Sequence, residues 1–232
     1  MKQARGFTLV ELAVVIFVIT LLLGSILIPL STQVEQKQIS DTQKTLEEIK
    51  EALIGFALVN GYLPCPDTNN DGMEDVNVST GKCSTVSSGI AAGNLPWATL
   101  SVANTDVWGN RFRYISNERY AWRTPAAVIS LSGGGTDVRI CQTANCGGTG
   151  TAVVAAILSH GKNGYGATNS LSGTTNPNPT GADEIENTDG DREIVSRVIS
   201  APESSSGEFD DIVASLSRYI LFNRMVTAGR LP

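Results

Sequence analysis

The segment Gly6-Phe7-Thr8-Leu9-Val10-Glu11 leads into an uncharged run from Leu12 to Leu30, and this stretch decides the organisation of the chain. The run approaches the ~20 apolar residues that a helix needs to cross a bilayer. Lys2 and Arg5 precede it, so the positive-inside rule predicts a cytoplasmic N-terminus. We therefore expect a single-pass anchor, with the bulk of the chain on the far side of the membrane.

The apolar run differs from an ordinary secretory signal because it has no convincing small-x-small cleavage site. Glu11 is its unusual feature, since an ionisable side chain inside a membrane helix costs about 2.5–3.5 kcal/mol on insertion scales. Two interpretations stay open for Glu11. Its carboxylate either pairs with a positive charge or snorkels to the headgroups at the cytoplasmic edge.

This segment resembles the processing site of the type IV pilin superfamily, which includes the pseudopilins of type II secretion. A short basic leader ends in Gly6, and Phe7, Glu11 and an apolar helix follow. The resemblance implies that a prepilin peptidase cuts between Gly6 and Phe7 and methylates Phe7. It also implies that Glu11 pairs with the α-amino group of a neighbouring subunit's Phe7 and sets the register of a filament. The implied partners are other pilin or pseudopilin subunits, the peptidase and an inner-membrane assembly platform.

We expect four parts in the chain: a leader peptide at 1–6, a transmembrane helix at 7–30, an amphipathic stalk helix at 31–60 and a periplasmic globular domain at 61–232. In the stalk, apolar residues recur every three to four positions, which is typical of a helix that packs one face on a core. These residues are Ile39, Leu46, Ile49, Leu53 and Phe56. Asn60-Gly61 is the expected end of the helix.

The globular part shows short apolar or alternating runs that predict strands rather than strand-helix alternation. The expected strands are 111–116, 126–131, 138–141 and 152–158, and the spacing over 209–226 predicts a C-terminal helix. The segment from Asp106 to Tyr114 resembles the Asp-Pro-Trp-Gly-Asn-Pro-Tyr segment of major pseudopilins, with Val107 in place of proline. The expected fold is α+β and pilin-like: a long N-terminal helix on an antiparallel sheet, with a C-terminal helix.

Net charge and cysteine content limit the classes of function and the compartment that fit this chain. The 232 residues carry a net charge of −6, which argues against a nucleic-acid binder. The cysteines lie after the apolar run, and their spacing favours two local disulfides in an oxidising compartment, Cys65–Cys83 and Cys141–Cys146. A zinc site is the alternative, but neither pair has C-x-x-C spacing.

Calcium is the one cofactor to which the sequence points, and two acidic loops are candidates. Asp67, Asn69 and Asp71 have the D-x-N-x-D-G spacing of a calcium loop, with Asp75 as a further ligand, although Val78 replaces the bidentate glutamate. The second loop offers Asn187, Asp189 and Asp191, and major pseudopilins carry calcium in a comparable late loop. A solvated acidic turn is the alternative for both loops.

We find no convincing catalytic constellation, because His160 is the only histidine and no G-x-S-x-G elbow surrounds a serine. We therefore expect a non-enzymatic structural subunit, more specifically a minor one because the chain is long, of a type IV pilus or a type II secretion pseudopilus. The alternative function is a membrane-anchored periplasmic binding module or enzyme that binds calcium or carbohydrate. Trp97, Trp108 and Trp122 are the residues that a sugar-binding role would use.

Overall fold

A computed structural model of the chain describes residues 8–123, 137–147 and 149–231, without the side chains of residues 23–30. The chain divides into two compact units, Met1–Ser40 and Asp41–Pro232, which we describe separately. Helix α1, Leu9–Asn60, contributes to both of them. Its backbone is helical through Gly24 and Pro29, and Gly61 follows its last residue with a φ of 83°.

In the first unit, the described residues of α1 from Leu9 to Leu22 expose their side chains. Large apolar residues are prominent among them, with exposed fractions from 46% at Val15 to 85% at Leu9. Such a surface needs lipid or protein around it, because water does not favour a contiguous apolar patch of this kind. Among the described residues, no helix has the length and hydropathy required of a membrane span.

In the second unit, the remaining part of α1 packs one face on the core. Leu46, Ile49 and Leu53 are at most 1% exposed, which confirms their predicted role in packing. Ile54 and Ala57 extend the same face. Phe56 is half-buried and meets Tyr62 edge to face at 5.7 Å. Burying an apolar face on a sheet supplies most of the stability of such a helix.

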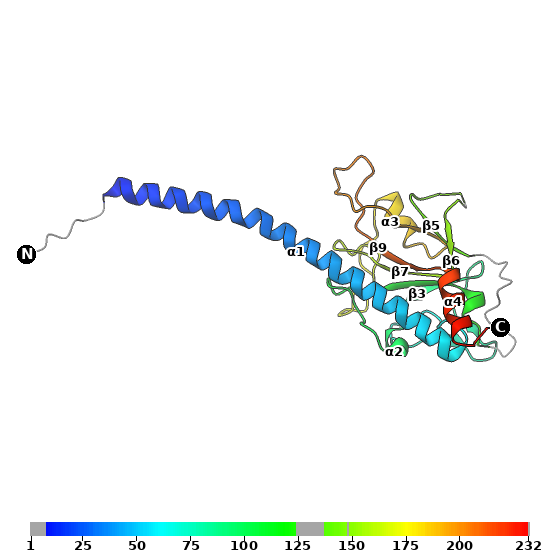
Figure 1. Cartoon of the computed structure of the whole chain (residues 1–232). Coiled ribbons are helices and arrows are strands. Elements are labelled where there is room, and N and C mark those ends of the chain that lie inside the picture. The colour runs from blue at the N-terminus through cyan, green and yellow to red at the C-terminus, as the bar shows by residue number, and fades with distance from the viewer. Residues whose placement is uncertain (1–7, 124–136, 148, 232) are drawn as a thin grey trace, which may run out of the picture. The chain divides into compact units, whose positions relative to one another are not determined.

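The main sheet has four antiparallel strands in the order β3-β4-β7-β9. Their bounds are Ile90–Asn94, Arg113–Asn117, Ala155–Ser159 and Ile212–Leu216. β7 is buried along its whole length, because it lies between β4 and β9 in the sheet and is covered on both faces. Figure 1 shows the 41–60 part of α1, in cyan, lying across this sheet.

Smaller elements complete the second unit. β5, β6 and β8 form a three-stranded sheet in the order β6-β5-β8, in which β5 and β8 are parallel, and β1 pairs with β2 in a short hairpin. The bounds are Val76–Asn77 for β1, Lys82–Cys83 for β2, Val138–Cys141 for β5, Thr151–Val153 for β6 and Glu193–Val195 for β8. The helices are α2, Trp97–Leu100; the 3-10 turn η1, Glu118–Tyr120; α3, Ala182–Glu186; and α4, Arg218–Thr227.

The α+β fold, with a long N-terminal helix on an antiparallel sheet and a C-terminal helix, is the pilin-like fold expected from the sequence. Strands occupy the predicted positions at 113–117 and 138–141, and the one strand predicted over 152–158 is instead two strands, β6 and β7, in different sheets. The predicted strand at 126–131 lies outside the described residues. The prediction of one helix over 209–226 was wrong. Residues 212–216 form β9 instead, because they pair with β7 and bury alternate side chains on one face of the sheet, and α4 begins only at Arg218.

Candidate functional site

The first turn of α1 carries a reciprocal cap between Thr8 and Glu11. The backbone N–H and the hydroxyl of Thr8 donate to Oε2 of Glu11 at 2.9 and 2.8 Å, and the backbone N–H of Glu11 donates to Oγ1 of Thr8 at 3.3 Å. This is a capping box, in which a threonine before the helix and a glutamate in its first turn satisfy each other's amides. In the described part of the chain, Oε1 of Glu11 has no hydrogen-bond partner and remains available to a cation.

Gly6 and Phe7, the predicted processing residues, lie outside the described residues. Thr8 is the first residue that the structure describes and it sits directly after them. Cleavage between Gly6 and Phe7 would therefore leave an α-amino group one residue before the cap. Glu11 would then stand one helical turn from that end of the chain, where a carboxylate is also favoured by the helix dipole.

Two disulfides join Cys65 to Cys83 and Cys141 to Cys146, the pairs that the spacing favours. The first bond closes the loop that contains the Asp67 turn and the β1–β2 hairpin. Cys65 and Cys83 belong to a small buried cluster with Ala91 and Ala121. This disulfide therefore attaches the loop to the core, as expected in a domain that matures in an oxidising compartment.

In the first acidic loop, hydrogen bonds within the loop occupy the carboxylates. Asp67 is fully buried, and it accepts bonds from the backbone N–H groups of Asn69, Asn70 and Gly72 at 2.7 to 3.1 Å. Asp75 accepts from the backbone N–H and hydroxyl of Thr68 and from the side-chain amide of Asn69. Asp71 accepts from the backbone N–H of Met73 at 2.7 Å.

The described residues contain three groups of acidic, cysteine or histidine side chains close enough to share a metal ion, and Asp67, Asp71 and Asp75 are in none of them. The turn is tight because Gly72, with a φ of 84°, lies against the indole of Trp97, where a Cβ atom would overlap the ring. The structure thus gives the first loop a self-contained polar network.

The second acidic loop is divided between two environments. Asn187 is fully buried, where its amide donates to Asp211 at 2.7 Å and exchanges hydrogen bonds with the backbone of Val195. Asp189 and Asp191 lie on the surface and form a group with Glu186, with carboxylate oxygens within 4.8 Å of one another. Burial, followed by repulsion from Asp189, raises the pKa of Glu186 to about 7. The three predicted ligands therefore do not converge as a set.

A different acidic group is buried nearby, where α3 meets the start of β9. Carboxylate oxygens of Glu184, Asp210 and Asp211 lie within 4.8 Å of one another, and Glu184 and Asp211 are 3% and 4% exposed. Burial raises the pKa of Glu184 and, with repulsion from Asp211 and Glu184, raises that of Asp210 to about 7. We call Glu184, Asp210 and Asp211 the buried acidic cluster.

The buried acidic cluster has only partial hydrogen bonding. Oδ2 of Asp210 and Oε1 of Glu184 both accept from Asn163, at 2.8 and 3.1 Å, but Oδ1 of Asp210 is buried without a partner. The backbone approaches closely here, because a Cβ atom on Gly161 would overlap the Asp210 side chain. His160 is 1% exposed, and its Nδ1 lies 3.4 Å from Oδ1 of Asp211.

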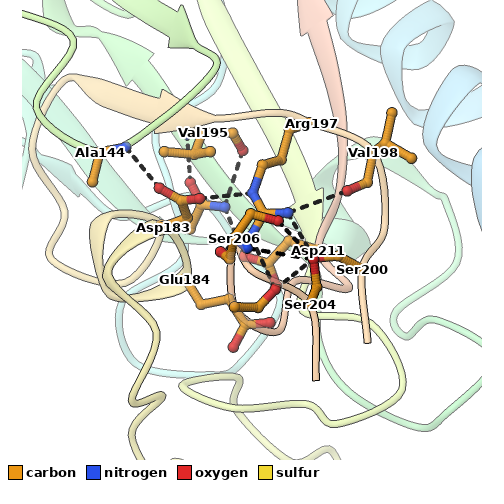
Figure 2. Close-up of polar contacts among 12 residues, drawn as sticks. Ala144, Asp183, Glu184, Val195, Arg197, Val198, Ser200, Ser204, Ser206 and Asp211 are labelled. Carbon is orange, nitrogen blue, oxygen red and sulfur yellow. Dashed lines mark hydrogen bonds and ion pairs between the residues drawn. The ribbon is translucent and has the colours of Figure 1, made fainter. Parts of the chain in front are cut away.

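Figure 2 shows how Arg197 holds the segments that carry the cluster. Its Nε donates to Oδ2 of Asp183 at 2.7 Å, next to Glu184 on α3. Its Nη1 donates to the hydroxyl of Ser200 at 2.7 Å, and its Nη2 donates to the carbonyl of Ser206 at 3.0 Å. Arg197 therefore joins α3 to the loop that runs into β9.

Candidate features of an enzyme or a sugar-binding site do not assemble in the described residues. The hydroxyl of Ser159 donates to Asp106 at 2.6 Å, while Nδ1 of its neighbour His160 lies 3.4 Å from Asp211. The serine and the histidine therefore contact different carboxylates and do not form a Ser-His-Asp relay. Trp97 and Trp122 make separate contacts. Trp97 packs on Gly72, and Lys82 lies 4.3 Å from the centre of the Trp122 ring.

Comparisons with known proteins identify the N-terminus only. Residues 1–27 match a family model described as the prokaryotic N-terminal methylation motif. No curated protein and no solved structure is significantly similar to the chain.

Proposed function

Because the N-terminal methylation motif marks the type IV pilin and pseudopilin superfamily, we propose that this pilin-like protein is a minor structural subunit of a type IV pilus or a type II secretion pseudopilus. Members of this superfamily are usually non-enzymatic. In the proposal, a prepilin peptidase cuts between Gly6 and Phe7 and methylates Phe7. The chain is anchored in the inner membrane with residues 61–232 in the periplasm, and α1 then carries it into the filament.

The observation that carries the proposal is the match of residues 1–27 to the methylation motif, within which a continuous helix with exposed apolar side chains begins at Leu9. The cap on Glu11 adds a physical reason for the pairing. Thr8 donates to Oε2, which holds the carboxylate of Glu11 at the N-terminal end of its own helix. Oε1 is then the oxygen that can accept from an α-amino cation. A charge pair in an apolar filament core is sensitive to register, because a displaced partner leaves a buried charge unpaired.

N-terminal peptide mass spectrometry of the full chain, expressed with and without a prepilin peptidase, tests the proposal. We expect a chain that starts at N-methylated Phe7 only when the peptidase is present. Gly6→Val is expected to block that cleavage, and Gly55→Ala, at a position where the added Cβ has open space, is the matched control. A chain that keeps Met1 in the presence of the peptidase would favour a membrane-anchored periplasmic module instead.

We also propose that the buried acidic cluster, rather than Asn187, Asp189 and Asp191, holds calcium. Its three carboxylates supply the hard oxygen ligands that calcium prefers. Oδ1 of Asp210 is a buried acceptor without a partner in the described part of the chain, which is a costly state for a carboxylate oxygen. Bound calcium would neutralise this group and join α3 to the start of β9.

Calcium titration with thermal unfolding as the readout tests this site. We expect calcium to raise the unfolding temperature of the full chain, and a chelator to reverse the rise. Asp210→Asn should abolish the response, whereas Asp189→Asn should leave it in place. Loss of the response in the Asp189 variant alone would assign the ion to the exposed group with Glu186 and Asp191.

A further inference from the structure

We propose that Asn77 is an acceptor for an N-linked glycan. Asn77-Val78-Ser79 has the Asn-x-Ser/Thr pattern of such acceptors, in which x is any residue except proline. It is the only tripeptide of this kind in the 232-residue sequence, since Asn178 has a threonine two residues later but is followed by Pro179. The inference rests on the proposed export of residues 61–232, because glycan transferases of this kind act on exported chains.

The position of Asn77 makes it accessible to an enzyme. Asn77 ends β1 and pairs with Lys82 at the start of β2. The tripeptide therefore begins the turn at 78–81 that joins these two short strands. Asn77, Ser79 and Thr80 are exposed, and Val78 is 93% exposed. The hairpin is fixed at its base by the Cys65–Cys83 disulfide, since Cys83 pairs with Val76.

The hydrogen bonds of Asn77 leave its nitrogen available. Its side-chain Oδ1 accepts from the backbone N–H groups of Ser79 and Thr80 at 3.0 and 3.2 Å, which is an Asx turn. Its carbonyl oxygen accepts from Thr80 and Gly81. Within the described residues Nδ2 has no hydrogen-bond partner. The turn therefore holds the amide by its oxygen and leaves the nitrogen of this exposed side chain open to solvent.

The donor class that this acceptor requires is an oligosaccharide linked through C1 of its first sugar to a polyprenyl diphosphate. A bond forms between Nδ2 of Asn77 and that C1 atom. The bond between C1 and the diphosphate oxygen breaks, and the lipid diphosphate leaves with the electron pair. Nδ2 gives one proton to a base of the transferase, and no group is oxidised or reduced.

Glycopeptide mass spectrometry on the full chain from its own cells tests the proposal. We expect the peptide that contains Asn77 to carry a sugar mass on that residue, while the peptide with Asn178 stays unmodified. Asn77→Gln and Ser79→Ala should each remove the added mass, and Ser79→Thr should retain it. Ser79→Ala keeps the backbone N–H that the Asx turn uses, so a loss there reports the hydroxyl rather than the fold.

The same digest separates this proposal from the proposed function, because it also reports whether Phe7 is the methylated N-terminus. An unmodified Asn77 in a chain that begins at methylated Phe7 would overturn the glycan site and leave the pilin-like function intact. A sugar that persists in the Ser79→Ala variant would also overturn it, since the acceptor pattern would then not be the determinant.

Discussion

The two units of the chain differ in how their residues are constrained. In the first unit, the described side chains from Leu9 to Leu22 are exposed and the segment matches a known processing motif. In the second, a core of fully buried residues supports an α+β fold, and no known protein or structure is significantly similar to the chain. Processing needs particular residues at fixed spacing, whereas a packed core accepts many sequences of the right pattern and volume.

The largest expected effect, on filament assembly, comes from Glu11 in the first unit. Glu11→Gln should still be cleaved and methylated, but its incorporation into filaments should fall roughly 100-fold, because a broken buried charge pair costs about 3 kcal/mol or more. Immunoblotting of sheared filaments and of membranes provides the measurement. Glu35→Gln, which makes the same change further along α1, is the control. Normal incorporation of the Glu11 variant would contradict a role in assembly.

The second expected effect separates the two units by stability. Leu53→Ala, at a fully buried position, should lower the free energy of unfolding by about 2–5 kcal/mol. Leu21→Ala, where the side chain is 60% exposed, should leave it unchanged. Denaturant unfolding of the full chain in detergent, followed by tryptophan fluorescence, measures both variants. Equal losses would show that the two parts of α1 share one core.

Sequence patterns predicted the parts of this fold that have a regular periodicity. The spacing of Leu46, Ile49 and Leu53 predicted the buried face of α1, and the position of the cysteines predicted both disulfides. The helix predicted over 209–226 failed because Phe209, Ile212, Val213 and Leu216 match helical spacing, while pairing with β7 determines the actual conformation. A non-local partner of this kind leaves no periodicity in the local sequence.

The acidic sites show the same difference between local and non-local information. Asp67, Asn69 and Asp71 have the spacing of a calcium loop, yet three backbone amides of the loop donate to the buried Asp67 carboxylate. The buried acidic cluster was missed because Glu184 and Asp210 come from segments far apart in sequence. The adjacent pair Asp210-Asp211, at the start of an apolar run, was the one signal that could have indicated it.

The third prediction compares the disulfides within the second unit. Replacing Cys65 and Cys83 by serine should cost about 3 kcal/mol, because their bond closes a loop with a sequence separation of 18. The same change at Cys141 and Cys146, with a separation of 5, should cost about 2 kcal/mol, since less chain entropy is restricted. Unfolding curves of the two double variants provide the comparison. A larger loss of unfolding free energy at the shorter loop would mean that native packing, rather than loop entropy, determines what each disulfide contributes to stability.

The smallest expected effect is at Thr8. Thr8→Val removes the hydroxyl from the cap of α1, which should reduce helix stability at this end by about 1 kcal/mol and leave the second unit unaffected. Amide hydrogen exchange of the first turn measures this change, and Thr20→Val, whose hydroxyl bonds to carbonyls within the helix, is the control. Unchanged exchange in the Thr8 variant would mean that the cap is not formed in solution.

The contacts that α4 and the residues after it make with α1 have a consequence for how the chain matures. Arg224 lies 3.3 Å from Glu51, Arg230 donates to the carbonyl of Val59 at 2.8 Å, and β9 is added to the sheet from the same late part of the sequence. The first helix of the domain therefore completes its packing with residues synthesised after the other strands of the main sheet. Folding of such a topology is slow, because distant segments must meet before the core forms. In the proposed export, Leu46, Ile49 and Leu53 stay uncovered until residues 212–230 have crossed the membrane, so the domain would need protection from aggregation up to that point.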